Sequence, residues 1–204
     1  GRNNALREMR KAMAFHLAGD QHLSVVTHHG IENFRDGPVT FVSPALINNY
    51  YSRWWWPEGG EAGANPIEDS PLPWTGDYLD GLGNKITMIA YANPDPGSTR
   101  RGKRDPNEDW ADGYGLVRFD KKAQTVVFEC WSRFADLSKG DAGQYPGWPM
   151  KFNMSQNDGR EAVAYLPELS FKGISNPVVQ VVNEATGEEL YTTRVQGNSY
   201  RPKV

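Results

Sequence analysis

The four histidines of this 204-residue chain all lie between His16 and His29, and one of them belongs to a compact polar motif. Asp20 and His22 are separated by a single residue and follow Gly19, which allows the backbone to turn sharply. A carboxylate oxygen and an imidazole nitrogen held close together form a ligand pair suited to Fe, Mn or Zn, and oxygen ligands also accept Ca. The pattern predicts a metal site at Asp20 and His22.

The residues around this pair predict a strand, a tight turn and a helix. Residues 14–18 form a short apolar run typical of a buried strand, and residues 21–29 fit a helix of about two turns that ends at Gly30. Ligands in α/β folds sit at the carboxyl ends of strands. A D-x-H pattern is short and also arises by chance, so the strand before it is what favours the metal site.

The remaining histidines have two interpretations. On the predicted helix His22 and His29 share a face, so His29 is a third candidate ligand, and His28 and His16 rank below it. Alternatively, a histidine in the last turn of a helix interacts favourably with the free carbonyls and the helix dipole, which explains His28 and His29 without a metal.

Two further clusters are candidates for substrate binding. Five aromatic residues surround Arg53, namely Tyr50, Tyr51, Trp54, Trp55 and Trp56. On a strand, alternate rings face opposite sides, so Trp55 or Trp56 would line a pocket for the organic part of a ligand, and Arg53 would bind a phosphate through paired hydrogen bonds. The alternative is that the rings pack a long loop onto a sheet. Four basic residues between Arg100 and Arg104 either touch an anion or belong to a solvated loop.

Hydrophobic periodicity predicts a mixed α/β chain with strands in its second half. A helix is expected over 4–15, capped by Asn3 or Asn4. Loops rich in Gly and Pro are expected over 57–73 and 93–107. Strands are expected over 39–47, 86–91, 115–119, 125–131, 178–182 and 190–195. The last two flank a Thr-Gly turn and predict an antiparallel hairpin.

Charge, apolar runs and cysteine content bear on the partners and the location of the chain. The net charge of −3 provides no basic surface for nucleic acid, and no apolar run reaches the 18 residues of a membrane span. No signal peptide is evident. The single cysteine, Cys130, lies in a strand-like run and is expected to pack in the core; its isolation does not by itself indicate a cytosolic protein.

Several segments together resemble one enzyme family. The chain is similar to the later half of PhoD-like alkaline phosphatases, with the Gly-Asp-Gln-His segment as the most specific part. The resemblance covers nearly the whole chain and is carried by residues 1–8, 15–23, 34–45, 53–57, 113–119, 128–131, 146–149, 177–182 and 201–204.

The resemblance implies a calcineurin-like phosphoesterase fold, in which water activated between two metal ions hydrolyses phosphate esters. It implies part of a two-layer α/β sandwich with a mixed sheet, in which residues 1–113 belong to the metallophosphoesterase core and residues 114–204 are a β-rich portion of the same domain with a C-terminal antiparallel element. Only Asp20 and His22 match a ligand motif of the family. The family's upstream motifs have no counterpart here, so this chain is expected to be half a site, cut at both ends and inactive alone. The resemblance also implies export to the periplasm or cell surface.

Two other functions remain open. A non-catalytic β-rich module would bind carbohydrate through exposed tryptophans, but it leaves the Gly19–His22 motif unexplained. An interaction subunit would assemble with a separate chain that carries the other ligands.

Overall fold

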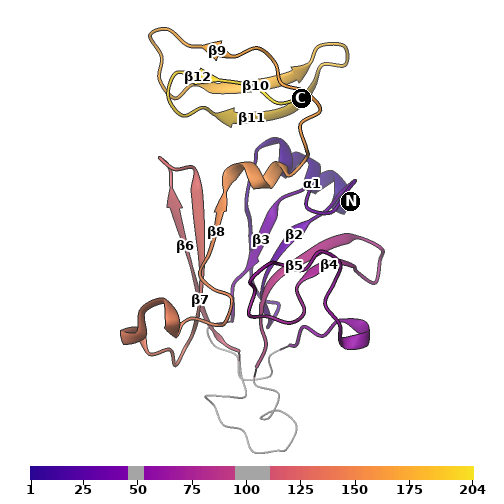
Figure 1. Cartoon of the computed structure of the whole chain (residues 1–204), viewed down its shortest axis with the longest axis vertical. Helices are drawn as coiled ribbons and strands as arrows, with labels where there is room; N and C mark the ends of the chain where they lie inside the picture. Colours follow the sequence, from indigo (N-terminus) through magenta and orange to yellow (C-terminus); the bar gives the residue numbers. More distant parts are fainter. Residues whose placement is uncertain (46–52, 95–110) are drawn as a thin grey trace, which may run out of the picture.

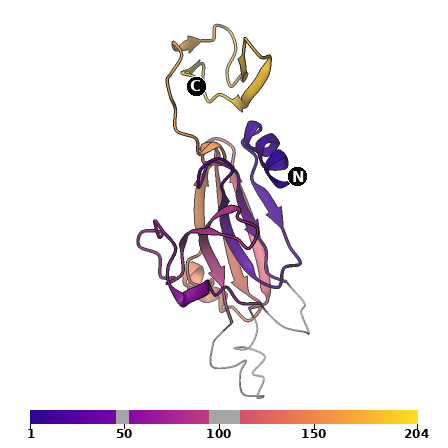
Figure 2. The same ribbon diagram turned by 90° about the vertical axis from the view of Figure 1, so that its right-hand side faces the viewer.

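The protein is a strand-rich mixed α/β structure. The computed structural model describes residues 1–45, 53–94 and 111–204. A five-stranded sheet faces a three-stranded sheet, and a small β module lies beyond one end of this sandwich (Figure 1). Turned by 90°, the same molecule shows the strands of the two sheets running side by side as two layers (Figure 2). The predicted mixed α/β class is confirmed at this level.

The five-stranded sheet has three strands that end at the same edge. It contains β1 (His16–Ala18), β2 (Ser24–His29), β3 (Val39–Val42), β4 (Gly76–Leu79) and β5 (Lys85–Ala92) in the order β1-β3-β2-β5-β4. β1 pairs with β3 in parallel, whereas β2 is antiparallel to both β3 and β5. The carboxyl ends of β1, β3 and β5 therefore lie together, beside the start of β2.

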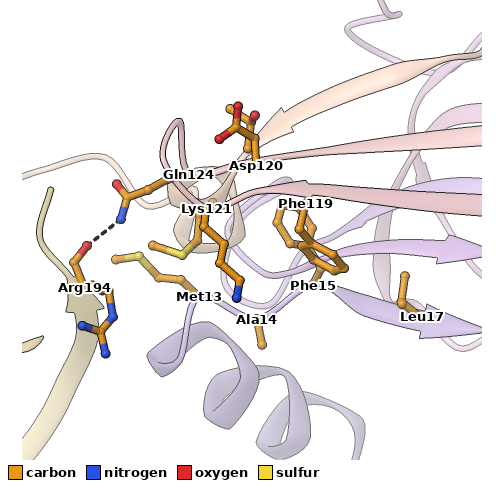
Figure 3. A pocket seen from close by; sticks show the side chains of 11 residues that line it. Met13, Ala14, Phe15, Leu17, Phe119, Asp120, Lys121, Gln124 and Arg194 are labelled. Atoms are coloured by element: carbon orange, nitrogen blue, oxygen red, sulfur yellow. Dashed lines mark hydrogen bonds between the residues drawn. The ribbon is translucent and has the colours of Figure 1, made fainter. Parts of the chain in front are cut away.

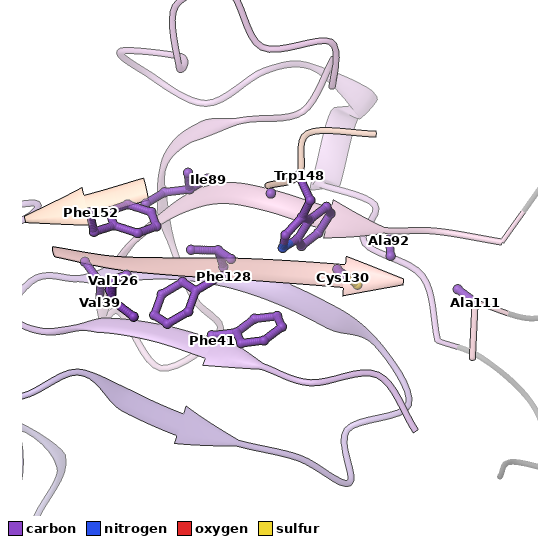
Figure 4. Close-up of a cluster of buried hydrophobic side chains, with 12 residues drawn as sticks. Val39, Phe41, Ile89, Ala92, Ala111, Val126, Phe128, Cys130, Trp148 and Phe152 are labelled. Carbon is purple, nitrogen blue, oxygen red and sulfur yellow. The ribbon is translucent and has the colours of Figure 1, made fainter. Parts of the chain in front are cut away.

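The second sheet covers the first and completes the core. It consists of β6 (Gly113–Asp120), β7 (Thr125–Ser132) and β8 (Met150–Asn153), all antiparallel. Phe41 of β3 stacks on Phe128 of β7 with ring centroids 5.0 Å apart, inside a shared cluster of buried side chains (Figure 4). The sheets approach so closely at Gly115 that a Cβ there would lie 2.7 Å from the Phe41 ring. Residues from both portions distinguished in the sequence, 1–113 and 114–204, therefore contribute to one core.

The helix and the β module occupy one end of the sandwich. α1 (Arg2–Lys11) has Gly1 as its N-cap without a side-chain cap, so the predicted caps Asn3 and Asn4 are wrong. The helix also ends before the predicted Phe15, because Met13 adopts a positive φ of 47°. Three short 3-10 helices interrupt the loops of the described residues: η1 (Glu58–Gly60), η2 (Leu137–Gly143) and η3 (Met154–Asp158).

The C-terminal module consists of two strand pairs. The predicted hairpin is confirmed, because β10 (Val178–Asn183) and β11 (Glu188–Arg194) pair antiparallel. β9 (Leu169–Ser170) pairs with β12 (Ser199–Tyr200). Val181 and Tyr191 of the module form a small buried cluster with Met13, which follows α1. This cluster joins the module to the rest of the chain.

One predicted element is wrong in type. Residues 21–29 were expected to form a helix, but residues 24–29 form β2, between β3 and β5 in the sheet. The β-branched run Val25, Val26 and Thr27 favours extended backbone, and pairing on both sides stabilises it. The strand predicted over 39–47 ends at Val42, and residues 46–52 lie outside the described part of the chain.

Candidate functional site

The Gly19–His22 segment is an exposed loop directly after β1. It leaves the sheet at the edge where β1, β3 and β5 end, as the sequence predicts for a ligand loop. Asp20 is exposed and His22 is half-buried. Both adopt left-handed backbone, with φ of 63° and 56°. Asp and His are among the residues that tolerate this region best, but two such residues in one short loop still carry a conformational cost.

A second segment is held against this loop. The backbone N–H of Arg53 donates a hydrogen bond to the carbonyl of His22 at 2.7 Å. Two residues on, Trp55 and Asn93 exchange hydrogen bonds, since the Trp55 N–H donates to Asn93 Oδ1 at 2.8 Å and Asn93 Nδ2 donates to the Trp55 carbonyl at 2.9 Å. Segments that follow β1, β3 and β5 therefore meet at one edge. The structure brings Asp20, His22 and Arg53 into the same region.

The aromatic residues after Arg53 divide into packed and exposed rings. Residues 53–57 are not a strand, so the predicted alternation of faces is wrong. The Trp55 indole N–H donates to the Trp74 carbonyl at 2.9 Å, and its ring meets Tyr78 edge-on at 5.1 Å. Trp55 thus packs the loop, whereas Trp56 is 62% exposed and leans on Trp74. Tyr50 and Tyr51 lie outside the described residues, as do Arg100–Arg104.

His29 lies at the opposite end of β2 from the ligand loop. The helical geometry that would turn it toward His22 is absent, and the six extended residues Ser24–His29 span roughly 17 Å. Arg2 Nη2 donates to His29 Nδ1 at 3.1 Å, so the other nitrogen, Nε2, carries the proton toward Thr40 Oγ1 at 2.8 Å. Burial, with the positive charge of Arg2 next in size, lowers the pKa of His29 to about 4. In this arrangement His29 is a neutral structural histidine.

The other two histidines also have local partners. His28 is buried, and its Nε2 lies 2.8 Å from the carbonyl of Gly37. Burial lowers the pKa of His28, so it too is favoured in the neutral form. His16 Nδ1 lies 3.1 Å from Thr40 Oγ1. Neither histidine caps a helix, because both belong to strands.

A buried carboxylate at the same edge was not found from the sequence. Asp112 precedes β6, whose first amide donates to the Ala45 carbonyl beyond β3 at 2.9 Å. The Asp112 side chain is 1% exposed, and its Oδ2 lies 3.0 Å from Arg133 Nη1. Burial raises the pKa of Asp112, while the charge of Arg133 opposes this. No motif surrounds Asp112 in the sequence, so only the fold identifies it.

Cys130 is a packing residue, as predicted. It is fully buried in the core cluster, and its thiol lies 3.2 Å from Ser24 Oγ. Burial raises the pKa of the thiol to about 12, which keeps it protonated and unreactive.

The donor chemistry of the loop suits a metal, but the number of donors does not complete a site. Asp20 and His22 offer a carboxylate and an imidazole, the ligand types of Fe, Mn and Zn centres. Across residues 1–45, 53–94 and 111–204, no group of three or more His, Cys, Asp or Glu side chains is placed to hold an ion. A metal ion held by Asp20 and His22 would need further ligands from outside these residues.

Comparison with known proteins provides no relative for this chain. No protein-family model, no curated protein and no solved structure matches it. Within the described residues, no helix is long and apolar enough to cross a membrane. The case for a function therefore depends on the residues at the edge of the sheet.

Proposed function

We propose that this chain takes part in the metal-dependent hydrolysis of phosphate esters, with Asp20 and His22 as its metal ligands. The observation that supports this most is the placement of both residues on one exposed turn at the carboxyl end of β1. Their left-handed backbone has a cost that packing does not explain for the exposed Asp20, and such strain is concentrated at functional sites.

Two ligands do not fix an ion, so no catalytic step follows from this chain alone. A bound ion pair would supply an activated water and a positive charge for the phosphoryl oxygens. The chain's own part is to present Asp20 and His22, and to place Arg53 beside them for a phosphate oxygen. The remaining ligands would come from an upstream half of the same protein or from a separate chain. Fe, Mn or Zn suits the pair, and Ca is an alternative partner ion.

The proposal includes the family suggested by the sequence. A PhoD-like metallophosphatase would place this sheet in a two-layer metallophosphoesterase sandwich and would be exported to the periplasm or cell surface. The strand, turn and Asp-x-His order supports this assignment. An intact mass of the natural protein well above that of these 204 residues would support an upstream half.

The test is metal content and turnover in the protein isolated from its natural source. Asp20→Ala and His22→Ala are expected to lose metal and the hydrolysis of p-nitrophenyl phosphate and its diester analogue. Asp69→Ala is a matched control. Asp69 is also exposed and has left-handed backbone with φ of 56°, but it lies outside the Gly19–His22 loop. Wild-type metal and turnover in both ligand variants would refute the assignment.

The chain alone gives a second test. Residues 1–204 supplied with Zn, Mn, Fe or Ca are expected to show no turnover, because the part of the chain that the structure describes offers too few ligands to hold an ion. Activity that appears only after the upstream half is added would support a divided site. Turnover by these residues alone would contradict it.

One observation favours carbohydrate binding as a second candidate. Trp56 is 62% exposed and lies 4.7 Å from Trp74, an arrangement that offers an aromatic face to a sugar ring. Binding of oligosaccharides that is lost in Trp56→Ala and unaffected by Asp20→Ala would select this function over hydrolysis.

A further inference from the structure

A groove of about 530 Å³ lies between the sandwich and the C-terminal module. Its wall is mostly apolar and comes from the chain after α1, from β1, from the β6–β7 turn and from η3 (Figure 3). The apolar residues are Met13, Ala14, Phe15, Leu17, Phe119 and Met154. The volume falls within the range of about 300 to 1,000 Å³ that is typical of small-molecule sites.

Parts of this apolar wall are open to solvent. Phe119 is 63% exposed and Leu17 is 49% exposed, although both belong to strands. Phe15 meets Phe128 of the core edge-on at 5.7 Å, so the groove continues from the packed interior. An apolar body in the groove would cover these side chains and gain the free energy of burying them.

Two of the three charged residues that line the groove, Lys121 and Arg194, are basic, and the third is Asp120. Lys121 reaches over the apolar wall, whereas the carboxylate of Asp120 turns away (Figure 3). That carboxylate is held by the backbone amides of Lys122 and Ala123, both at 2.9 Å. Within the described chain, Lys121 has no ion-pair partner. A cation therefore stands free at the mouth of an apolar site.

A second groove adjoins the first and is also basic. It has a volume of about 540 Å³, shares Lys121, Gln124 and Arg194 with the first groove, and has no acidic residue in its lining. Gln124 Nε2 donates to the Arg194 carbonyl at 2.5 Å, which joins the β6–β7 turn to the module at the boundary between the grooves. An anionic group at this boundary would face Lys121 and Arg194.

We propose that the apolar groove binds an amphiphilic organic anion, with an alkyl or aryl body against Phe15, Leu17 and Phe119 and a terminal carboxylate or phosphate at Lys121 and Arg194. Apolar lining combined with a few polar groups that fix orientation is the usual composition of a ligand site. The charge of Lys121, together with that of Arg194, whose Nη1 also donates to the Asn176 carbonyl at 3.0 Å, selects an anion over a neutral or cationic amphiphile. This site is independent of the proposed metal function.

The test is calorimetric titration of the protein with ten-carbon probes below their micelle concentrations. Decanoate and decyl phosphate are expected to bind, with decanol roughly fivefold weaker, since one exposed charge pair contributes up to about that factor. Decyltrimethylammonium is expected to bind more weakly than decanol, and inorganic phosphate is expected not to bind detectably. Equal binding of the anionic, neutral and cationic amphiphiles would mean that the groove is a non-specific apolar surface, and it would overturn the proposal.

Matched variants locate the site. Lys121→Glu is expected to weaken decanoate binding by about five- to tenfold, and Phe119→Ser to weaken it at least as much. Lys139→Glu and Phe134→Ser are the controls, because they change an exposed lysine and an exposed phenylalanine outside the groove. Thermal melts confirm that each variant folds. Equal losses in the controls, or binding to phosphatidylglycerol vesicles without binding to single decanoate molecules, would contradict a groove site.

Discussion

Replacing Asp20 and His22 by glycine is expected to stabilise the protein while it removes the proposed metal ligands. Both residues have positive φ, a conformation that costs a residue with a Cβ about 1–2 kcal/mol. Glycine removes this cost but adds about 0.5–1 kcal/mol of unfolded-state entropy. The net stabilisation is therefore about 0.5–1 kcal/mol at Asp20. It is smaller at His22, which is half-buried and loses side-chain contacts.

The assay is thermal unfolding of the two single variants and the double variant. For a chain of this size, 1 kcal/mol shifts Tm by about 2–4 °C, so the Asp20→Gly variant should melt about 1–4 °C above the wild type. Asp69→Gly is the control for backbone strain alone, since Asp69 has φ of 56° and is exposed. It should gain stability without affecting metal or turnover.

The stability and metal results together decide the interpretation. A Tm that falls by several degrees in Asp20→Gly, while Asp69→Gly rises, would mean that the Asp20 side chain supports the fold. The strain would then need no functional explanation. Loss of metal together with a higher Tm is the pattern expected where a strained conformation is kept for function.

Three further predictions concern the rest of the fold. The pKa of His29 is lowered from its usual 6.5 to about 4, so between these pH values the folded state binds fewer protons than the unfolded state. The contribution of His29 to stability is therefore full above pH 6.5 and falls by up to about 3 kcal/mol toward pH 4. His29→Gln should flatten this slope in pH-dependent denaturation, and an unchanged slope would contradict the prediction. Trp55→Ala should destabilise by about 3 kcal/mol and Trp56→Ala by much less in urea unfolding, and Trp56→Ala should instead raise KM for bulky phosphate esters. Gly115→Ala should cost about 1–3 kcal/mol, because the new Cβ meets the Phe41 ring, and a wild-type Tm would refute this close approach.

Local patterns predicted the strands that alternate or run apolar, but not the type of the segment after the ligand pair. The terminal hairpin followed from two β-branched runs around a Thr-Gly turn, and it is present. The β2 segment was expected to be helical because Gly30 resembled a helix end and His22, Val26 and His29 fit a helical face. Pairing with β3 and β5, from residues far along the chain, decided the outcome. Such tertiary pairing is not visible in local periodicity.

The site was predictable only where a motif lies within a few residues. Asp20 and His22 are neighbours in sequence, so their shared turn was expected. The contact of Arg53 with the His22 carbonyl depends on how the chain returns after β3, and the burial of Asp112 depends on the second sheet. His29 was placed with His22 through the helical period, and an extended strand separates the two residues instead.

The order of the strands in the chain also determines when the core can close during synthesis. All five strands of the first sheet are complete at Ala92, but the aromatic residues that cover its inner face, Phe128 and Phe152, come later. At about 5 to 20 residues per second, a ribosome needs roughly 3 to 12 s to extend the chain from Ala92 to Phe152. During this time the face that carries Phe41 lacks the cover that Phe128 and Phe152 later provide. Newly made protein should therefore need a chaperone more than the finished protein does.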